Sequence, residues 1–330
     1  MFSINKIINL SIFFLFFICC QALAEQSKVN FNEWLKSYKK YAASKGISQN
    51  TIDVAFKNVK FLDQVIKYDR KQPEFFEDTN TYVSKRANNI RVNKGKKLLK
   101  KNKNLFDNIE KNFLVEKEIL LALWGIETNF GRNVGKMDII SSLATLSYDK
   151  RRSDFFSSEL ITLLKLIDSK IINIEDLYGS WAGAYGNFQF MPSTINMYAL
   201  DYDNNNKIEL KTSLEDSLAS AANYLNRVGW VINEPCYYKV KLKKELNKKY
   251  LNISARGIKN RLKISKWKKK GVVMYDGSEI PENKKAALIL PDNNENSPVF
   301  LVFPNYENIL KWNRSLRFGL SVCTLANMLK

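Results

Sequence analysis

Apolar residues recur at helical spacing over most of the first two thirds of the chain. Steps of three and four residues between apolar positions run through 31–38 and 115–123, and they mark one face of a helix in each stretch. Residues 160–172 and 213–228 follow the same rule. We therefore expect residues 25–234 to form a mainly helical body.

The pattern changes after Pro235. Short apolar runs at 237–242, 287–290 and 299–303 are separated by Asp, Asn, Gly and Pro, which is typical of short β-strands joined by turns. The Lys-rich stretch 259–270 between them is expected to be an exposed surface.

Helical periodicity returns over residues 306–329. We therefore expect a small β-rich subdomain over 235–305 and a C-terminal helix over 306–330 that rejoins the helical body. The predicted fold class is α+β, mainly α.

The N-terminus resembles an export signal. Lys6 precedes an apolar run over 7–20, and Ala22-Leu23-Ala24 supplies small residues before a cleavage site at Glu25. Residues 1–24 are therefore predicted to be a signal peptide, which places the mature protein in the periplasm.

Anchoring to a membrane is disfavoured. Cys19 and Cys20 raise the alternative of a lipoprotein, but the bulky Phe17 and Ile18 argue against lipid attachment at Cys20. The apolar run is also too short for a confident membrane span.

The amino-acid composition excludes several classes of catalytic and metal site. The chain contains no histidine, which excludes Ser-His-Asp and Cys-His nucleophiles and imidazole-dependent zinc sites. Outside the signal peptide only Cys236 and Cys323 remain, and they either pair in an oxidising compartment or stay free.

The chain is strongly basic, with 52 Lys and Arg against 33 Asp and Glu. Such a charge attracts polyanions. An exported protein rarely meets nucleic acid, so an anionic cell-wall polymer is the expected partner. The alternative is that part of the charge is only a solvated, Lys-rich surface.

Glu127 ends an otherwise apolar stretch, residues 119–126. Burial disfavours the charged form of a carboxyl group and raises its pKa, which lets it donate a proton near neutral pH. The alternative from the local sequence is a helix-terminal glutamate whose carboxyl group reaches solvent.

A glycine-rich block covers residues 179–193. Its glycines allow close approach of backbone to a ligand. Ser180 and Gln189 can bond a polar group, while Trp181 and two further aromatic residues offer flat faces that suit a sugar chain. Taken alone, the block favours a structural glycine-rich loop.

Together, these motifs resemble the lytic murein transglycosylase B family over nearly the whole mature chain. The matching blocks, in order, are 69–75, 126–131, 142–146, 151–160, 179–192, 222–230 and 312–315. The resemblance implies a lysozyme-like helical core that cleaves the β-1,4 bond between N-acetylmuramic acid and N-acetylglucosamine in peptidoglycan.

The resemblance also implies a mechanism that uses one carboxyl group. The position that matches the family's catalytic acid is Glu127, which would protonate the glycosidic oxygen and then, as a base, activate the muramic acid O6 hydroxyl. A 1,6-anhydro ring closes and no water is consumed. The alternatives are a hydrolytic muramidase and a peptidoglycan-binding scaffold without turnover. We expect no required cofactor, no nucleic-acid partner and a monomer.

Other family positions carry over as substrate contacts. Ser180, Gln189 and Asn313 match residues near the cleavage subsites, and Tyr224 matches a tyrosine that lines the cleft.

Arg151 and Arg152 have two interpretations. They hold a carboxylate of the substrate by charge-assisted bonds, or they form a structural ion pair with Glu159 or Asp154.

A loop after residue 200 resembles part of an EF-hand and predicts a structural Ca²⁺ site. The ligand positions are Asp201, Asp203, Asn205, Lys207 and Glu209. Thr212 stands where the usual bidentate acid belongs, so Glu215 or Asp216 would have to supply the missing ligand.

Overall fold

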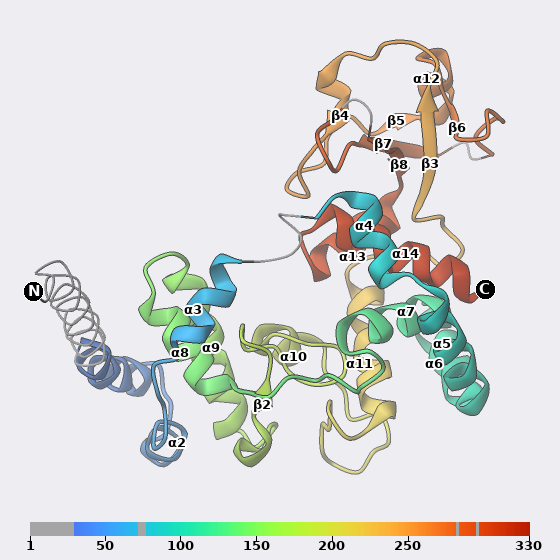
Figure 1. Cartoon of the computed structure of the whole chain (residues 1–330). Helices are drawn as coiled ribbons and strands as arrows, with labels where there is room; N and C mark the ends of the chain where they lie inside the picture. The colour runs from blue at the N-terminus through green and yellow to red at the C-terminus, as the bar shows by residue number, and fades with distance from the viewer. Residues whose placement is uncertain (1–29, 72–76, 282–283, 295–296) are drawn as a thin grey trace, which may run out of the picture. The chain divides into compact units, whose positions relative to one another are not determined.

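The structure is a computed structural model, shown in Figure 1, and it describes residues 30–71, 77–281, 284–294 and 297–330. The predicted signal peptide and residues 72–75 of the first family block lie outside the described residues. Packing divides the chain into two compact units. The first unit is Met1–Asp69 with Met137–Gly183, and the second is Arg70–Lys136 with Ala184–Lys330.

The first unit is helical. After a helix over residues 30–44, its elements are α2 (Gln49–Ala55), α3 (Asp63–Arg70), β1 (Met137–Asp138), α8 (Ile139–Tyr148), α9 (Ser153–Asp168), the 3₁₀ turn η2 (Ile174–Asp176) and β2 (Tyr178–Gly179). Residues 139–147 of α8 are all buried, and this helix packs against α9. Phe31 and Tyr148 meet edge to face at 5.5 Å within an aromatic cluster on the same core.

The second unit holds the other helices and the larger sheet. Its helices are α4 (Thr79–Arg86), α5 (Asn89–Lys101), α6 (Lys103–Phe113), α7 (Lys117–Thr128), α10 (Pro192–Tyr198), α11 (Leu214–Arg227), α12 (Ile264–Lys269), α13 (Pro304–Trp312) and α14 (Leu316–Leu329). Helix α7 packs against α5, α6, α11 and α14, which makes it the centre of the helical core. Among the described helices, none combines the length and the apolar character needed to cross a bilayer.

The sheet has the strand order β4-β7-β8-β3-β6, with β5 also paired to β7. Its strands are β3 (Tyr237–Leu242), β4 (Leu251–Asn252), β5 (Leu262–Lys263), β6 (Val272–Met274), β7 (Lys285–Ile289) and β8 (Val299–Val302). The pairs are antiparallel except β4 with β7. In the register between β3 and β8, Val240 faces Val299.

One face of this sheet has a hydrophobic core of its own. Val240, Leu288 and Leu301 contribute to it from three adjacent strands, and α12 covers it with Trp267. The Trp267 side chain is fully buried, and its indole N–H donates to the Ala286 carbonyl oxygen at 2.8 Å. The Lys-rich stretch 259–270 is therefore only partly the exposed surface that the sequence predicts, because its apolar residues close the core.

The C-terminal segment differs from the prediction of one helix. It forms two helices, α13 and α14, because Asn313 adopts an extended φ of −140° and Ser315 caps α14 by accepting from the Phe318 N–H at 3.3 Å. A disulfide joins Cys236, next to β3, to Cys323 in α14, with the Cα atoms 6.1 Å apart.

The predicted α+β, mainly α class is confirmed, whereas the subdomain boundaries at 234 and 305 stay a prediction.

Candidate active site

Glu127 lies on the last turn of α7, where a buried helix meets a tight turn. Residues 119–125 are all buried, so packing holds the helix on every side. Asn129, Phe130 and Gly131 follow with positive φ angles of 52°, 60° and 77°. The backbone therefore reverses within one turn of Glu127, and the carboxyl group lies where the helix ends.

A close ring contact fixes this reversal. The Phe130 ring lies against Gly125, where an added Cβ would come within 2.7 Å of a ring carbon. The same ring meets Trp124 edge to face at 5.6 Å. Glycine at position 125 thus allows the turn to fold back onto its own helix.

Asn187 ties the glycine-rich block to the end of α7. Its side-chain oxygen accepts from the Trp124 indole at 3.0 Å, and its carbonyl oxygen accepts from the Thr128 hydroxyl at 2.8 Å. Its amide group donates to the carbonyl of Leu210 at 3.3 Å. The residue is buried and bonds both α7 and the segment at Leu210, which positions residues 184–193 beside the end of the helix that carries Glu127.

The carboxyl group of Glu127 has a hydrogen-bond partner far away in sequence. The indole N–H of Trp312, the last residue of α13, donates to Oε1 of Glu127 at 3.1 Å. Trp312 is held by aromatic neighbours whose ring centroids lie 5.1 Å away at Phe190 and 4.9 Å away at Tyr224. This cluster orients the indole toward the acid.

Burial among these groups raises the pKa of Glu127 from 4.5 to about 8, and the Trp312 hydrogen bond opposes the rise. The side chain is still partly exposed. A carboxyl group that is desolvated and yet partly open to solvent is protonated near neutral pH and can be reached by a substrate. This environment favours the buried-acid interpretation over a solvated helix end.

Three other predicted substrate contacts lie in the same unit as Glu127. Tyr224 is buried beside Trp312, and burial raises its pKa to about 12. Asn313 directly follows Trp312 at the end of α13. Gln189 lies in the glycine-rich turn, and its amide donates to the backbone carbonyls of Val134 at 3.1 Å and Gly186 at 2.9 Å. Gln189 thus stabilises the turn, and a substrate contact through it would have to use its amide oxygen.

The remaining predicted contacts belong to the first unit. Arg151 and Arg152 both bond the carboxylate of Asp69, whose side chain is buried. Burial alone would raise the pKa of Asp69, but the two guanidinium groups hold it below its usual value. Ser180 accepts from the Ala182 N–H at 3.2 Å, and Trp181 is partly exposed. The arginines therefore have a structural partner, Asp69, that the sequence interpretation did not name.

Sequence reasoning missed two residues of this arrangement. Trp312 and Asn187 both fall in the family blocks, but nothing local connects them to Glu127. The Trp312 contact spans 185 residues and the bond from Trp124 to Asn187 spans 63. Only the folded chain reveals such pairs.

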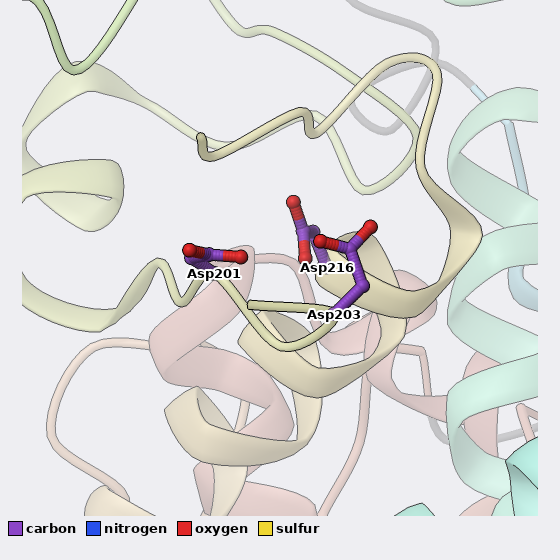
Figure 2. Close-up of side chains that lie close together, drawn as sticks. All are labelled: Asp201, Asp203 and Asp216. Atoms are coloured by element: carbon purple, nitrogen blue, oxygen red, sulfur yellow. The ribbon is translucent and has the colours of Figure 1, made fainter. Parts of the chain in front are cut away.

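The predicted calcium loop brings three carboxylates together, as Figure 2 shows. Ligand oxygens of Asp201, Asp203 and Asp216 all lie within 4.8 Å of one another. Asp216, at the start of α11, is fully buried, and it accepts from the backbone N–H of Tyr202 at 2.8 Å and of Glu209 at 2.9 Å.

The rest of the loop has the internal bonds of a compact turn. Asp201 accepts from the Asn206 N–H at 2.8 Å, and Asn205 accepts from the Lys207 N–H at the same distance. Asn206 adopts a positive φ of 65°. Three converging acids with no Lys or Arg ion pair among the described residues form an oxygen-rich group that fits a hard divalent cation.

Comparison with known proteins places this arrangement in a family. Residues 30–327 match the model of the transglycosylase SLT domain family. The membrane-bound lytic murein transglycosylase B of Escherichia coli (strain K12) is 31% identical over 216 residues, which are 64% of this chain and 56% of that protein. The match thus spans little more than half the length of that relative.

Solved structures share the fold. The crystal structure of SltB3 from Pseudomonas aeruginosa in complex with NAG-NAM-pentapeptide has a TM-score of 0.83 and 32% identity, covering 91% of this chain and 79% of that chain. The Escherichia coli Slt35 structure in complex with calcium has a TM-score of 0.76 and 26% identity, covering 89% and 92%. These likenesses confirm the expected lysozyme-like helical fold with a small sheet. The chain belongs to the transglycosylase SLT domain family.

Proposed function

We propose that this protein is a peptidoglycan lytic transglycosylase that cleaves the N-acetylmuramic acid–β-1,4–N-acetylglucosamine bond without water. The observation that carries the proposal is the partly exposed acid Glu127, whose pKa burial raises to about 8. Family membership supports the reaction class, and the ligand of the SltB3 structure supports the substrate class.

The first step is proton donation. The Trp312 bond occupies Oε1 of Glu127, so the proton resides on Oε2. As the bond from C1 to the leaving oxygen breaks, this proton passes to the leaving N-acetylglucosamine O4, and positive charge develops at C1 of the muramic acid. The Trp312 N–H then stabilises the carboxylate that remains.

The second step restores the acid. The carboxylate of Glu127 takes the proton from the O6 hydroxyl of the same muramic acid, and O6 bonds to C1 to close a 1,6-anhydro ring. A hydroxyl held within the substrate replaces the activated water of a hydrolase, so one carboxyl group is sufficient. Burial raises the pKa of Glu127 without help from a second carboxylate, which is the environment such a cycle needs.

Mass spectrometry of the products tests the reaction. Purified peptidoglycan digested by this protein is expected to release muropeptides with 1,6-anhydromuramic ends, lighter by one water than hydrolysis products. Reducing ends would instead identify a muramidase, and bound but uncut glycan would identify a scaffold. The Glu127→Gln variant is expected to bind glycan and release no product.

We also propose that the protein works on glycan strands in the periplasm as a monomer, with residues 1–24 removed on export. The similar protein from Escherichia coli is a lytic murein transglycosylase, and this similarity supports a location in the periplasm. N-terminal sequencing of the protein recovered from a periplasmic extract tests it, and a mature chain that begins at Glu25 is the expected result.

We further propose that the loop from Asp201 to Asp216 binds a structural Ca²⁺. The convergence of three carboxylates supports the site, as does the calcium complex of Slt35. Asp201 and Asp203 would hold the ion with Asp216, which takes the place that Thr212 leaves open.

Calorimetry tests the calcium site. Calcium is expected to bind and to raise the melting temperature, and Asp203→Asn is expected to weaken both effects. Because Asp203 is exposed, that substitution should leave the fold intact without the ion. No heat and no thermal shift with calcium would end the proposal.

A further inference from the structure

The sheet subdomain carries a surface groove that the proposed reaction does not use. It has a volume of about 590 Å³, which is within the range of small-molecule sites. Six of its lining side chains are aliphatic, among them Leu246, Leu251 and Ile253. Ile253 is 51% exposed at its edge. The groove therefore has an apolar floor, on which Leu290 and Val299 are buried and Ile253 is open to solvent in the described part of the chain.

Lysines surround this floor. Among the described residues, Lys244 and Lys248 line the groove together with the acid Glu245. Lys249 and Lys270 lie close by, with their ammonium groups 5.3 Å and 4.3 Å from the centre of the Tyr250 ring.

Several of these charges are uncompensated. Lys244, Lys249 and Lys270 form no ion pair within the described part of the chain. An anion bound near them would be attracted by their charge.

The charge is concentrated in this subdomain. Residues 235–305 contain 16 Lys and Arg against 6 Asp and Glu, an excess of ten in a chain whose total excess is 19. About a fifth of the sequence thus carries about half of the net charge. A general solvated surface would spread the charge more evenly.

We propose that this groove docks the protein on a membrane surface by taking an anionic phospholipid. The aliphatic floor fits the first part of an acyl chain, and the lysines fit the phosphate of the headgroup. A glycan is a poorer occupant, since sugar rings are usually held against aromatic faces and the described lining consists of aliphatic and polar side chains. The docking is separate from the lytic reaction, because no groove residue is part of the Glu127 site.

Co-sedimentation with vesicles tests the proposal. The purified protein is expected to bind vesicles of equimolar phosphatidylglycerol and phosphatidylcholine and to stay in solution with phosphatidylcholine alone. The double substitution Lys244→Gln and Lys249→Gln is expected to weaken binding roughly 30-fold, which is two charges at about 1 kcal/mol each. Ile253→Ser, at an exposed position, is expected to weaken it as well.

The matched control is the double substitution Lys96→Gln and Lys97→Gln. It removes the same charge from exposed positions on α5. This control is expected to bind vesicles like the parent protein, and all variants should keep parental turnover of soluble glycan fragments.

Three results would overturn the proposal. The parent protein binds neutral vesicles equally well, or the two double lysine variants lose vesicle binding equally. In the third result, the Lys244→Gln and Lys249→Gln variant loses binding to intact peptidoglycan but keeps binding to vesicles. Glu127→Gln should still bind vesicles, which separates a failure of docking from a failure of the proposed reaction.

Discussion

The carboxyl group of Glu127 is desolvated by its neighbours and still partly exposed to solvent, and its charge state depends on both properties. Apolar surroundings raise the pKa to about 8, while Trp312 donates to the same carboxyl group and moderates the rise. The hydrogen bond is stronger to the ionised form, so it stabilises the species that exists between the two proton transfers. A single indole therefore serves both halves of the proposed cycle.

The raised pKa predicts how the rate depends on pH. Because the reaction begins with protonated Glu127, kcat/KM should stay constant up to about pH 8 and then fall about tenfold per pH unit. Initial rates on a soluble glycan fragment from pH 5 to about pH 10 would check this. A rate that already falls above pH 5 would mean that burial does not protect the proton.

The same pKa has a consequence for stability. Between the ordinary value of 4.5 and about 8, the folded state keeps a proton on Glu127 that the unfolded chain has released. Stability contributed by this group therefore falls as pH rises through that window. We expect Glu127→Gln to be more stable than the parent at pH 8, by on the order of 3 kcal/mol, and similar to it near pH 4. Urea unfolding at both pH values measures the difference.

Trp312→Phe should separate the hydrogen bond from the packing. The change keeps an aromatic ring but removes the donor to Glu127, so the pKa of Glu127 should rise further and turnover should fall about tenfold or more. Phe190→Leu is the control, because it disturbs the ring cluster but leaves the indole N–H in place. If both variants shift the alkaline limb equally, packing and not the hydrogen bond sets the pKa.

At the scale of elements, the sequence predicts those whose pattern is local. The strand expected over 237–242 and the helix expected over 213–228 appear as β3 and as α11 with its Ser213 cap. The long apolar stretch before Glu127 likewise becomes the buried helix α7.

Elements that depend on distant contacts are harder to predict. The break between α13 and α14 interrupts a continuous helical periodicity, and it is this break that places Trp312 at a helix end beside Glu127. The strands β4, β5 and β6, of two or three residues each, are too short for a periodic signal and exist through pairing with β7 and β3. The short strands depend on pairing with distant strands, whereas the helix break depends on the extended Asn313 and on the Ser315 cap.

Gly186 gives a prediction at this scale. Its φ is 77°, and an added Cβ would lie 2.5 Å from the carbonyl oxygen of Leu210, which anchors the glycine-rich turn through Asn187. Gly229 has a similar φ of 98° but open space around it. Gly229→Ala should cost about 1 kcal/mol through backbone strain alone, and Gly186→Ala should cost at least about 1 kcal/mol more. Chemical denaturation of both variants provides the comparison.

At the scale of the whole molecule, the order of the family blocks predicts the fold better than any one block does. Blocks from residue 69 to residue 315 supply both units, and the candidate site residues divide between them. Glu127, Gln189, Tyr224 and Asn313 belong to one unit, whereas the arginine pair belongs to the other. The sequence places the arginine pair, Glu127, Gln189 and Tyr224 in one helical domain over residues 25–234, so it does not predict this division, nor does it show that Asp69 already neutralises the arginines. An anionic substrate group would have to compete with that buried carboxylate for them.

The disulfide gives a last prediction. Cysteine spacing alone left open whether Cys236 and Cys323 pair, and the structure joins them across a sequence separation of 87 residues. The bond closes a loop that contains the whole sheet, so it restricts the unfolded chain. Replacing both cysteines by serine should lower the free energy of unfolding by about 2–4 kcal/mol. The parent protein unfolded in the presence of a reductant should lose a similar amount, while a reductant should leave the double variant unchanged. If the parent loses nothing on reduction, the bond does not form in solution.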